Sequence, residues 1–230
     1  MRDDPDALMV FAAGHGTRLR PLTLTTPKPL VPVAGRALLD HALCHATPDL
    51  VRRVVVNLHA HPDQMRAHLA RHPQVIPSEE PELLETGGGL KAALPHLGTG
   101  PVFTLNSDVV WRGPNPLAIL RAAWDPARMD ALLLCLPRER TRGHDGTGSF
   151  TLDPDGRLTA PGPLVYTGAQ ILRTDGLAAI PDRAFSVRLL WERIAAEGRV
   201  FGCLYPGHWA EAGSPDGLAA ATALLEDADV

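Results

Sequence analysis

The chain has 230 residues, of which 45% are hydrophobic and 21% charged, a size and composition that fit one large globular α/β domain or two small ones. Its 22 Lys and Arg residues and 26 Asp and Glu residues give a net charge of −4, which argues against general binding to nucleic acid or membrane surfaces. No apolar run approaches the roughly 20 residues of a membrane span, and a secretory signal pattern is absent. Three scattered cysteines indicate reduced thiols in a cytoplasmic protein: Cys44, Cys135 and Cys203.

Apolar segments of strand length alternate with segments of helical pattern in the first part of the chain. In order, the pattern predicts a strand at 7–13, a helix at 37–46, a strand at 51–58, helices at 63–70 and 90–97, a strand at 102–106, a helix at 117–124 and a strand at 131–136. These strands are apolar along nearly their whole length, which is typical of strands covered on both faces. The alternation predicts a mostly parallel sheet with helices on both faces.

The second half of the chain is less regular. Residues 149–152 and 157–158 flank the turn Asp153–Gly156 and predict a hairpin. Further along we expect, in order, a strand at 165–172, a helix at 186–197, a strand at 200–205 and a helix at 215–227. Ser214 is a suitable cap for the last helix, because its hydroxyl can accept a hydrogen bond from a first-turn amide.

The segment after the first strand concentrates glycine and positive charge. Gly14 and Gly16 allow the backbone to approach a bound group and to turn its amides toward that group. Arg18 and Lys28 add side-chain positive charge to the same region. Because loops at the carboxyl ends of parallel strands form the ligand crevice of an open sheet, this segment predicts a polyphosphate site.

Two general phosphate-binding motifs do not fit this segment. It lacks the G-x-x-x-x-G-K-[ST] pattern of the Walker loop, and Leu19 stands where the dinucleotide fingerprint needs a third glycine. Pro27, Pro29 and Pro32 are expected to keep the following segment extended and to keep Lys28 out of a helix. A lysine in such a rigid segment would hold its charge at a fixed reach.

Longer motifs point to a family. The loop reads A-A-G-H-G-T-R-L-R-P-L-T and is followed by T-P-K-P-L; later come Leu84–Gly89, Asn106–Asp108 and Gly207–Ser214. Together these stretches resemble, over about residues 7–226, the signature of the sugar-1-phosphate nucleotidyltransferases, also called NDP-sugar pyrophosphorylases. The E-T-G-G-G segment and the short chain look most like the bacterial N-acetylmuramate-1-phosphate uridylyltransferases of cell-wall recycling. Mannose-1-phosphate guanylyltransferases are the nearest alternative.

The resemblance implies a fold and a reaction. The fold is a single Rossmann-like nucleotidyltransferase domain over residues 1–230, with a nucleotide-binding N-terminal half, a small antiparallel sugar-phosphate-binding part in the C-terminal half, and no C-terminal repeat domain. The reaction is transfer of UMP from UTP to N-acetylmuramic acid 1-phosphate or a closely related sugar-1-phosphate, with release of pyrophosphate. Mg²⁺ is the implied cofactor, with Asp108 and Glu211 as its ligands. Glu211 stands where the family usually has aspartate, and Ser107 where it usually has glycine.

The resemblance also implies roles for individual residues. Arg18 would stabilise the departing pyrophosphate, Lys28 would hold the α-phosphate and the sugar phosphate, and with Asp108 they form the catalytic set. Gly87 and Gly88 would let backbone groups read the base edge. The full nucleotide-binding set is Ala12, Ala13, Gly14, Gly16, Thr17, Arg18, Lys28, Glu85, Gly87 and Gly88. The sugar-phosphate set is Asn106, Gly148, Thr167, Gly168 and Glu211.

Other readings of the same residues remain open. A GTP-dependent guanylyltransferase shares much of the pattern, and a sensor that binds nucleotide sugars without turnover would share the fold. Retention of Arg18, Lys28 and Asp108 together favours an enzyme, because a pure binder has little use for a cation on a leaving group. A monomer or weak homodimer is expected, because the repeat domain that supports larger assemblies in the family is not part of the pattern.

Histidine, tryptophan and arginine residues elsewhere give further expectations. His59 and His61, and His68 and His72, have spacings that occur in metal sites, but no cysteine or carboxylate pattern completes either pair, so no zinc site is expected. Tryptophans near the proposed metal residues are expected to border the sugar pocket: Trp111 and Trp209. Candidate partners for the lactyl carboxylate of N-acetylmuramic acid, unless they form only a solvated loop, are Arg138, Arg140 and Arg142.

Overall fold

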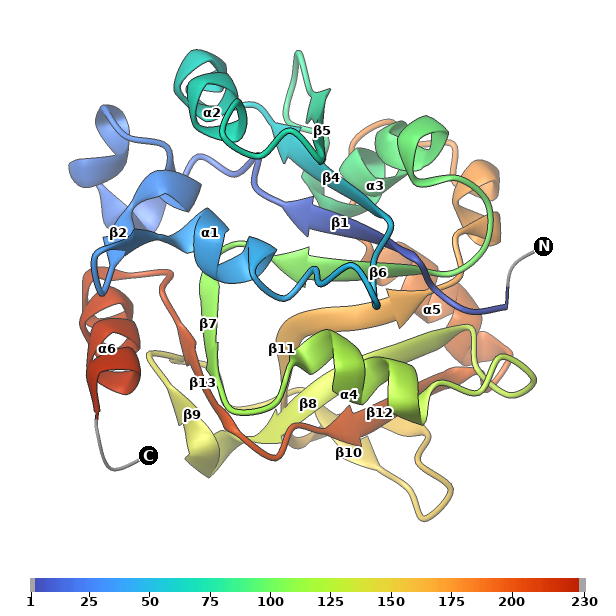
Figure 1. Ribbon diagram of the computed structural model, residues 1–230. Helices are drawn as coiled ribbons and strands as arrows, with labels where there is room; N and C mark the ends of the chain where they lie inside the picture. Colours follow the sequence, from blue (N-terminus) through green and yellow to red (C-terminus); the bar gives the residue numbers. More distant parts are fainter. Residues whose placement is uncertain (1–2, 228–230) are drawn as a thin grey trace.

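A computed structural model describes residues 3–227, and its core is a sheet of eight strands (Figure 1). Across the sheet the strand order is β12 (Val200–Leu204), β8 (Ala131–Pro137), β11 (Leu158–Leu172), β6 (Val102–Asn106), β1 (Ala7–Phe11), β4 (Arg53–Leu58) and β5 (Val75–Glu79). The remaining strand, β10 (Phe150–Leu152), pairs with β11 and forms the predicted hairpin.

Most neighbouring strands run parallel. β1 lies between β4 and β6 and is parallel to both, β4 is parallel to β5, and β12 is parallel to β8. β11 is the exception, because it runs antiparallel to both β6 and β8. The prediction of a mostly parallel sheet is confirmed, with one long antiparallel strand between two parallel groups.

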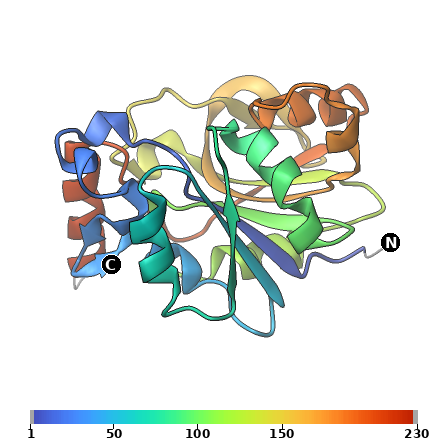
Figure 2. The same cartoon turned by 90° about the horizontal axis from the view of Figure 1, so that it is seen from above.

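Helices cover both faces of the sheet. In β1, Leu8 and Val10 belong to one apolar cluster, whereas Ala7 and Met9 belong to the other, because successive side chains of a strand point to opposite faces. The first cluster includes α1 (Leu38–Leu43), α2 (Pro62–Leu69) and α4 (Pro116–Ala123), and the second includes α3 (Glu85–Leu97) and α5 (Arg188–Ala196). Figure 2 shows α3 and α5 on one side of the sheet and α2 on the other. This double coverage explains the continuous apolar runs.

A smaller sheet continues from the carboxyl end of β6. It contains β7 (Val109–Arg112), β13 (His208–Glu211) and β9 (Thr141–Arg142), with β13 antiparallel to β7 and parallel to β9. The last helix, α6 (Pro215–Glu226), packs against it through an apolar cluster that includes Val110, Ala210 and Leu224. Ser214 caps α6 by accepting a hydrogen bond from the Gly217 amide, as predicted. The short strands β2 (Pro32–Val33) and β3 (Arg36–Ala37) pair before α1.

Several elements differ from the sequence-based expectations. Short 3₁₀ turns occupy residues 17–19, 22–24, 28–30, 138–140 and 175–179. The turn Lys28–Leu30 therefore replaces the predicted extended segment, since a proline in a first helical turn sacrifices no needed amide. β5 was not predicted, because it carries Pro77 and lies at the sheet edge, where proline is tolerated. Among residues 3–227, none of the helices has the length and apolar character that crossing a membrane requires.

Candidate active site

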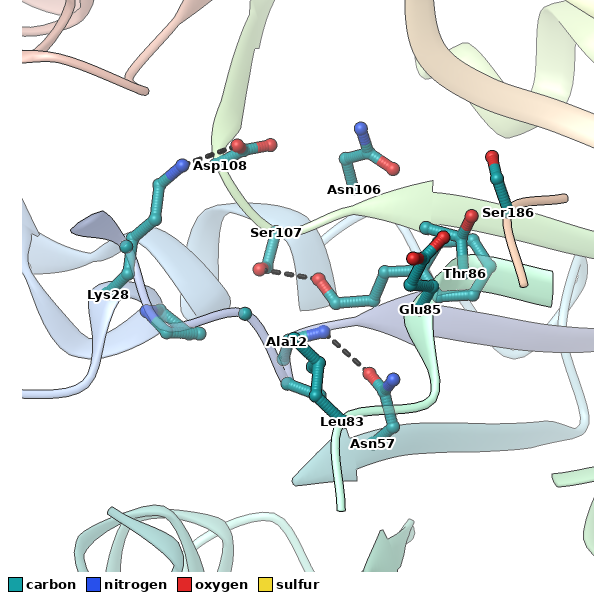
Figure 3. A pocket seen from close by; sticks show the side chains of 15 residues that line it. Ala12, Lys28, Asn57, Leu83, Glu85, Thr86, Asn106, Ser107, Asp108 and Ser186 are labelled. Atoms are coloured by element: carbon teal, nitrogen blue, oxygen red, sulfur yellow. Dashed lines mark hydrogen bonds and ion pairs between the residues drawn. The ribbon is translucent and has the colours of Figure 1, made fainter. Parts of the chain in front are cut away.

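The carboxyl ends of β1 and β6 border a pocket of about 430 Å³ (Figure 3). From β1 the chain proceeds outward to β4 and β5 on one side and then returns to β6 on the other, so the strand order reverses between β1 and β6. Ligands of open α/β sheets bind at such a reversal. The pocket therefore lies where the sequence placed the phosphate loop and the Asn106–Asp108 motif.

The structure brings some of the predicted residues to this pocket and leaves others outside it. Those that line it are Ala12, Ala13, Gly14, Gly16, Lys28, Glu85, Asn106 and Asp108. Those outside its lining are Thr17, Arg18, Gly87, Gly88, Gly148, Thr167, Gly168 and Glu211. Lining residues that the sequence had not placed in a binding or catalytic set are Phe11, Pro29, Asn57, Leu83, Thr86, Ser107 and Ser186.

Gly16 is required in the phosphate loop for a conformational and a steric reason. Its φ of 62° lies in the left-handed region that glycine adopts without strain. A Cβ at this position would lie 2.8 Å from Cβ of Lys28 and 2.9 Å from Cγ2 of Thr23. The Thr23 hydroxyl donates to the Gly16 carbonyl at 2.8 Å, so the loop closes on itself beside Lys28. Gly14 is different, because it is exposed and a Cβ there would meet nothing within 4 Å.

Lys28 and Asp108 form an ion pair at one side of the pocket. Lys28 Nζ donates to Asp108 Oδ2 at 2.6 Å, and the side chains are only 13% and 24% exposed. Ser107 fixes the position of this aspartate, because its amide and hydroxyl donate to the Phe11 carbonyl at 3.2 and 2.7 Å. The serine thus ties the end of β6 to the end of β1 (Figure 3).

Arg18 forms the second ion pair, with Glu211 on β13. Arg18 Nη2 donates to Glu211 Oε1 at 3.0 Å, and His144 Nδ1 lies 2.7 Å from Glu211 Oε2. The Arg18 side chain is 59% exposed, so it is held far less tightly than Lys28. A Cβ on Gly213 would lie 2.6 Å from Arg18 Nη2, so this glycine leaves room for the pair. His144 was not predicted, because its loop lies 67 residues from Glu211 in the sequence.

A buried polar chain connects the phosphate loop to the start of α3. Asn57 Oδ1 accepts a hydrogen bond from the Ala12 amide at 2.6 Å, and Asn57 Nδ2 donates to Glu80 Oε1 at 2.7 Å. The other Glu80 oxygen accepts from the Leu84 amide at 3.0 Å. A Cβ on Gly89 would lie 2.5 Å from Glu80 Oε1, so the glycine admits this carboxylate. Asn57 is the penultimate residue of the predicted strand 51–58, and its place directly after three valines is the signal that could have indicated it.

Residues 85–89 form the first turn of α3, which therefore begins before the predicted helix 90–97. The amides of Gly87 and Gly88 both donate to the Phe185 carbonyl, at 2.8 and 3.1 Å. A Cβ on Gly87 would lie 2.4 Å from the Phe185 ring, so the glycine allows close packing of this segment on the helix. These two amides already have a partner inside the protein, and a role of Gly87 and Gly88 in letting backbone groups read the base remains a prediction.

Glu85 and Thr86 form the pocket wall at the beginning of α3. Glu85 has a φ of 59°, and a left-handed conformation in a residue other than glycine or asparagine carries strain that is common at functional sites. Thr86 Oγ1 accepts a hydrogen bond from the Val187 amide at 3.0 Å and holds Ser186 beside the pocket. The segment before α5 therefore contributes to the same wall (Figure 3).

The predicted sugar-binding residues on β6, β11 and loop 138–148 have different surroundings. Gly168 on β11 packs against Asn106 on β6, because a Cβ on Gly168 would lie 3.0 Å from the Asn106 side chain. Thr167 is fully buried, and its hydroxyl donates to the Leu134 carbonyl at 2.6 Å. Its hydroxyl is therefore turned into the core, and a role of Thr167 in binding the sugar remains a prediction. Gly148 has a φ of 98° and lies against the backbone of residues 162–163.

Trp111 and Trp209 lie in the core instead of bordering a pocket. They are directly opposite each other on β7 and β13 and are 7% and 2% exposed. Trp209 Nε1 donates to the Thr167 carbonyl at 2.9 Å. The two tryptophans join the small sheet to the central sheet. Their closeness to Asp108 and Glu211 in the sequence did not indicate this packing role.

The loop arginines proposed for the lactyl carboxylate have internal partners. Arg138 donates to the Gly146 carbonyl, Arg140 donates to the carbonyls of residues 206 and 207, and Arg142 lies 4.0 Å from Asp227. These contacts hold loop 138–148 against neighbouring segments. A role in binding the sugar remains a prediction for the three arginines.

The carboxylates at this site differ in their capacity to hold a divalent metal. Magnesium prefers oxygen ligands, and one oxygen of Asp108 has no partner among residues 3–227. Both oxygens of Glu211 are engaged, one by Arg18 and one by His144. The residues fit an ion held by Asp108, whereas Glu211 would first have to release a partner.

Comparisons with known proteins agree with this geometry. The sequence matches the MobA-like NTP transferase domain over residues 8–224, which include every segment that lines the pocket. The chain belongs to this family. This NTP transferase is 43% identical to the N-acetylmuramate alpha-1-phosphate uridylyltransferase of Caulobacter vibrioides, over 99% of the chain and 100% of that protein. It is 33% identical to the Neisseria meningitidis protein of the same name, over 94% of the chain and 96% of that protein.

More distant relatives share the domain with less identity. A mannose-1-phosphate guanylyltransferase of Mycobacterium tuberculosis is 26% identical, over 94% of this NTP transferase and 64% of that protein. Among solved structures, a UDP-glucose pyrophosphorylase in complex with UDP-glucose matches with a TM-score of 0.78 at 16% identity, over 95% of this chain and 97% of that one. HddC from Yersinia pseudotuberculosis matches with a TM-score of 0.73 at 21% identity, over 94% and 98%. These structures show that the fold is shared.

Proposed function

We propose that this NTP transferase is a uridylyltransferase that transfers UMP from UTP to N-acetylmuramic acid 1-phosphate in the reuse of cell-wall sugar. The observation that carries nucleotidyl transfer is the pairing of two loop cations, Lys28 and Arg18, with the carboxylates of Asp108 and Glu211. Uridine and N-acetylmuramate are supported by the 43% identity to the Caulobacter vibrioides enzyme of that name.

The proposed chemistry depends on charge neutralisation. A sugar-phosphate oxygen forms a bond to the α-phosphorus of UTP while the bond to the bridging oxygen breaks, and the electron pair leaves with pyrophosphate. Both reactants are anionic, so positive charge must already be in place when they meet. Lys28 suits this task, because Gly16 packs against its Cβ and Asp108 holds its ammonium before substrate arrives. In this proposal Lys28 binds the α-phosphate and the sugar phosphate.

Arg18 has a different part in the proposal. The Arg18 side chain is more exposed than that of Lys28, and its carboxylate partner is Glu211. It can therefore turn from Glu211 to the departing pyrophosphate as charge grows there. Mg²⁺, when bound through the available oxygen of Asp108, would supply further positive charge between the phosphates.

The nucleotide is proposed to bind between the phosphate loop and the start of α3, and the sugar phosphate toward β11 and β13. Ala12, Gly14, Leu83 and Glu85 line the first part of the pocket. Asn106 lies between the two parts and packs against Gly168. This division assigns the nucleotide to the N-terminal half of one continuous domain and the sugar phosphate to segments that follow β6.

A substrate matrix tests the proposal. UTP and GTP are combined with N-acetylmuramic acid 1-phosphate, mannose 1-phosphate and N-acetylglucosamine 1-phosphate in the presence of Mg²⁺, and released pyrophosphate is measured. UTP with N-acetylmuramic acid 1-phosphate should exceed the GTP reaction at least tenfold in kcat/KM, which corresponds to about 1.4 kcal/mol. Preference for GTP and mannose 1-phosphate would identify a guanylyltransferase instead. Nucleotide binding without turnover on any sugar phosphate would identify a sensor.

A further inference from the structure

Two histidines and an aspartate meet between α1 and α2, outside the pocket described above. Asp40 lies on α1, His68 lies on α2, and His72 follows that helix. We propose that Asp40, His68 and His72 form a binding site for one transition-metal ion of the zinc class. The site is independent of the proposed uridylyltransferase activity, since none of its residues lines the nucleotide pocket.

The three potential ligand atoms converge on a small volume. Asp40 Oδ1 lies 2.7 Å from His68 Nε2 and 3.1 Å from His72 Nε2, and the ligand atoms all lie within 4.8 Å of one another. The two imidazole rings are stacked, with centroids 5.5 Å apart and an angle of 27° between planes. Ligand atoms around tetrahedral zinc lie about 3.3 Å apart, so the side chains need to open only slightly to admit an ion.

The donor set selects a different metal from the active site. Two imidazole nitrogens and one carboxylate oxygen favour zinc, cobalt or nickel, whereas Mg²⁺ prefers oxygen ligands alone. His68 is buried and Asp40 is only 19% exposed, so the site is partly shielded from water. Three protein ligands leave a fourth position for a water molecule. The proposal departs from the sequence-based expectation of no zinc site, because the fold brings the Asp40 carboxylate to the two histidines.

Arg71 opposes metal binding, so the proposal predicts that removing this arginine increases the affinity for the metal. Arg71 Nη2 lies 2.6 Å from His68 Nδ1, so the arginine donates to this nitrogen and His68 carries its proton on Nε2, facing Asp40. A metal on Nε2 requires this proton to move to Nδ1, and Arg71 must then turn away. The arginine is exposed and can do so. Removing it eliminates a competing donor and a nearby positive charge.

The site joins two segments that support the phosphate loop. Near the start of α2, His61 Nε2 lies 3.3 Å from the Thr23 carbonyl, and Gln64 donates to the Thr25 carbonyl at 2.8 Å. α1 is joined to the Lys28 turn by the hydrogen bond from the Leu38 amide to the Val31 carbonyl. An ion between α1 and α2 would cross-link both supports, so we expect it to stabilise the protein without taking part in the chemistry.

Metal titration of the full chain, produced without a histidine tag and freed of metal with a chelator, tests the site. Zn²⁺ is titrated against a competing chelator dye, and Co²⁺ is followed by its visible absorption. Wild type should bind one equivalent that survives Asp108→Asn, with nitrogen-ligated Co²⁺ bands and a rise in Tm. His72→Ala should weaken binding at least tenfold and abolish the rise in Tm, whereas His96→Ala, which changes an exposed histidine on α3, should bind as wild type does.

Arg71→Met provides the second arm, because it should bind Zn²⁺ at least threefold more tightly than wild type. A purely structural Asp–His network predicts no such gain. Equal Zn²⁺ affinity of wild type and His72→Ala, with both folded by circular dichroism, would overturn the proposal. Loss of the bound equivalent in Asp108→Asn would also overturn it, because the ion would then belong to the nucleotide pocket.

Discussion

Asn57 and Glu80 share a buried hydrogen bond of 2.7 Å that connects the phosphate loop to the start of α3. The same asparagine holds the Ala12 amide, and the same glutamate holds the Leu84 amide. Both side chains are nearly inaccessible, at 3% and 4% exposure. The two walls of the pocket are therefore positioned by one polar chain behind them.

Asn57→Ala should damage nucleotide binding more than turnover. The substitution leaves the Ala12 amide and one Glu80 oxygen without partners, which costs about 1–3 kcal/mol in the free energy of unfolding. We expect KM for the nucleotide to rise about tenfold with a smaller change in kcat, because the pair positions the pocket walls and not the reacting atoms. Steady-state kinetics and urea unfolding measure both effects. Glu80→Gln is the matched variant with a milder loss, and a fall in kcat alone for Asn57→Ala would contradict this role.

Lys28→Ala and Asp108→Ala should each lower turnover by about 100-fold or more, because each removes preorganised charge from the pocket. The measurement is the rate of pyrophosphate release at saturating substrates. Arg20→Ala is the control, since Arg20 is an exposed cation of the same loop that lies outside the pocket lining. Circular dichroism should show that all three variants fold. Turnover close to wild type in either test variant would exclude that residue from the mechanism.

Gly16→Ala and Gly14→Ala should have different effects on protein stability and on nucleotide binding. A methyl group on Gly16 meets Lys28 at 2.8 Å and forces a strained positive φ, so we expect lower Tm and lower turnover. A methyl group on Gly14 meets nothing in the protein, so Tm should stay the same. If the triphosphate lies against this backbone, KM for the nucleotide should still rise. Thermal melts and steady-state kinetics of both variants test this prediction. An equal decrease of Tm in the two variants would contradict the different roles of the two glycines.

Stability should depend on His45 at mildly acidic pH. Burial, with the nearby positive charges of His41 and Arg36, lowers the pKa of His45 to about 4. In the unfolded chain the pKa of His45 is about 6.5. Between pH 6.5 and pH 4 only the unfolded state takes up the proton, so the free energy of unfolding decreases as the pH is lowered. The loss reaches about 2 kcal/mol at pH 5. Urea unfolding of wild type and His45→Gln at pH 7 and pH 5 checks this, and an equal acid loss in both proteins would refute it.

Much of the fold could be predicted from the sequence because its signals are local. Strand β6 was predicted with its observed bounds, 102–106, and the Ser214 cap of α6 was predicted from residue type alone. The phosphate loop could be located because glycines and cations directly follow an apolar strand. The small sheet was missed, since Val109–Arg112 and His208–Glu211 become strands only by pairing with each other.

The site was harder to predict in detail than the fold. Gly87 and Gly88 carry a motif typical of nucleotide binding, yet their amides bond to Phe185, almost one hundred positions later in the chain. Thr167 was expected in the sugar pocket, but pairing of β11 with β8 turns its hydroxyl to Leu134. A motif states which residues occur together, whereas hydrogen-bond partners depend on which strands and helices become neighbours.

The sequence by itself determined the alternation of strands and helices, the glycine and proline positions of the loop, and the charges available for phosphate chemistry. These properties follow from backbone sterics and side-chain type within a few residues. Only the tertiary structure decided that Lys28 meets Asp108, that Arg18 meets Glu211, and that Asp40 lies against His68 from 28 positions away. The physical reason is that buried polar groups must find partners, and strand order fixes which groups are near enough to serve.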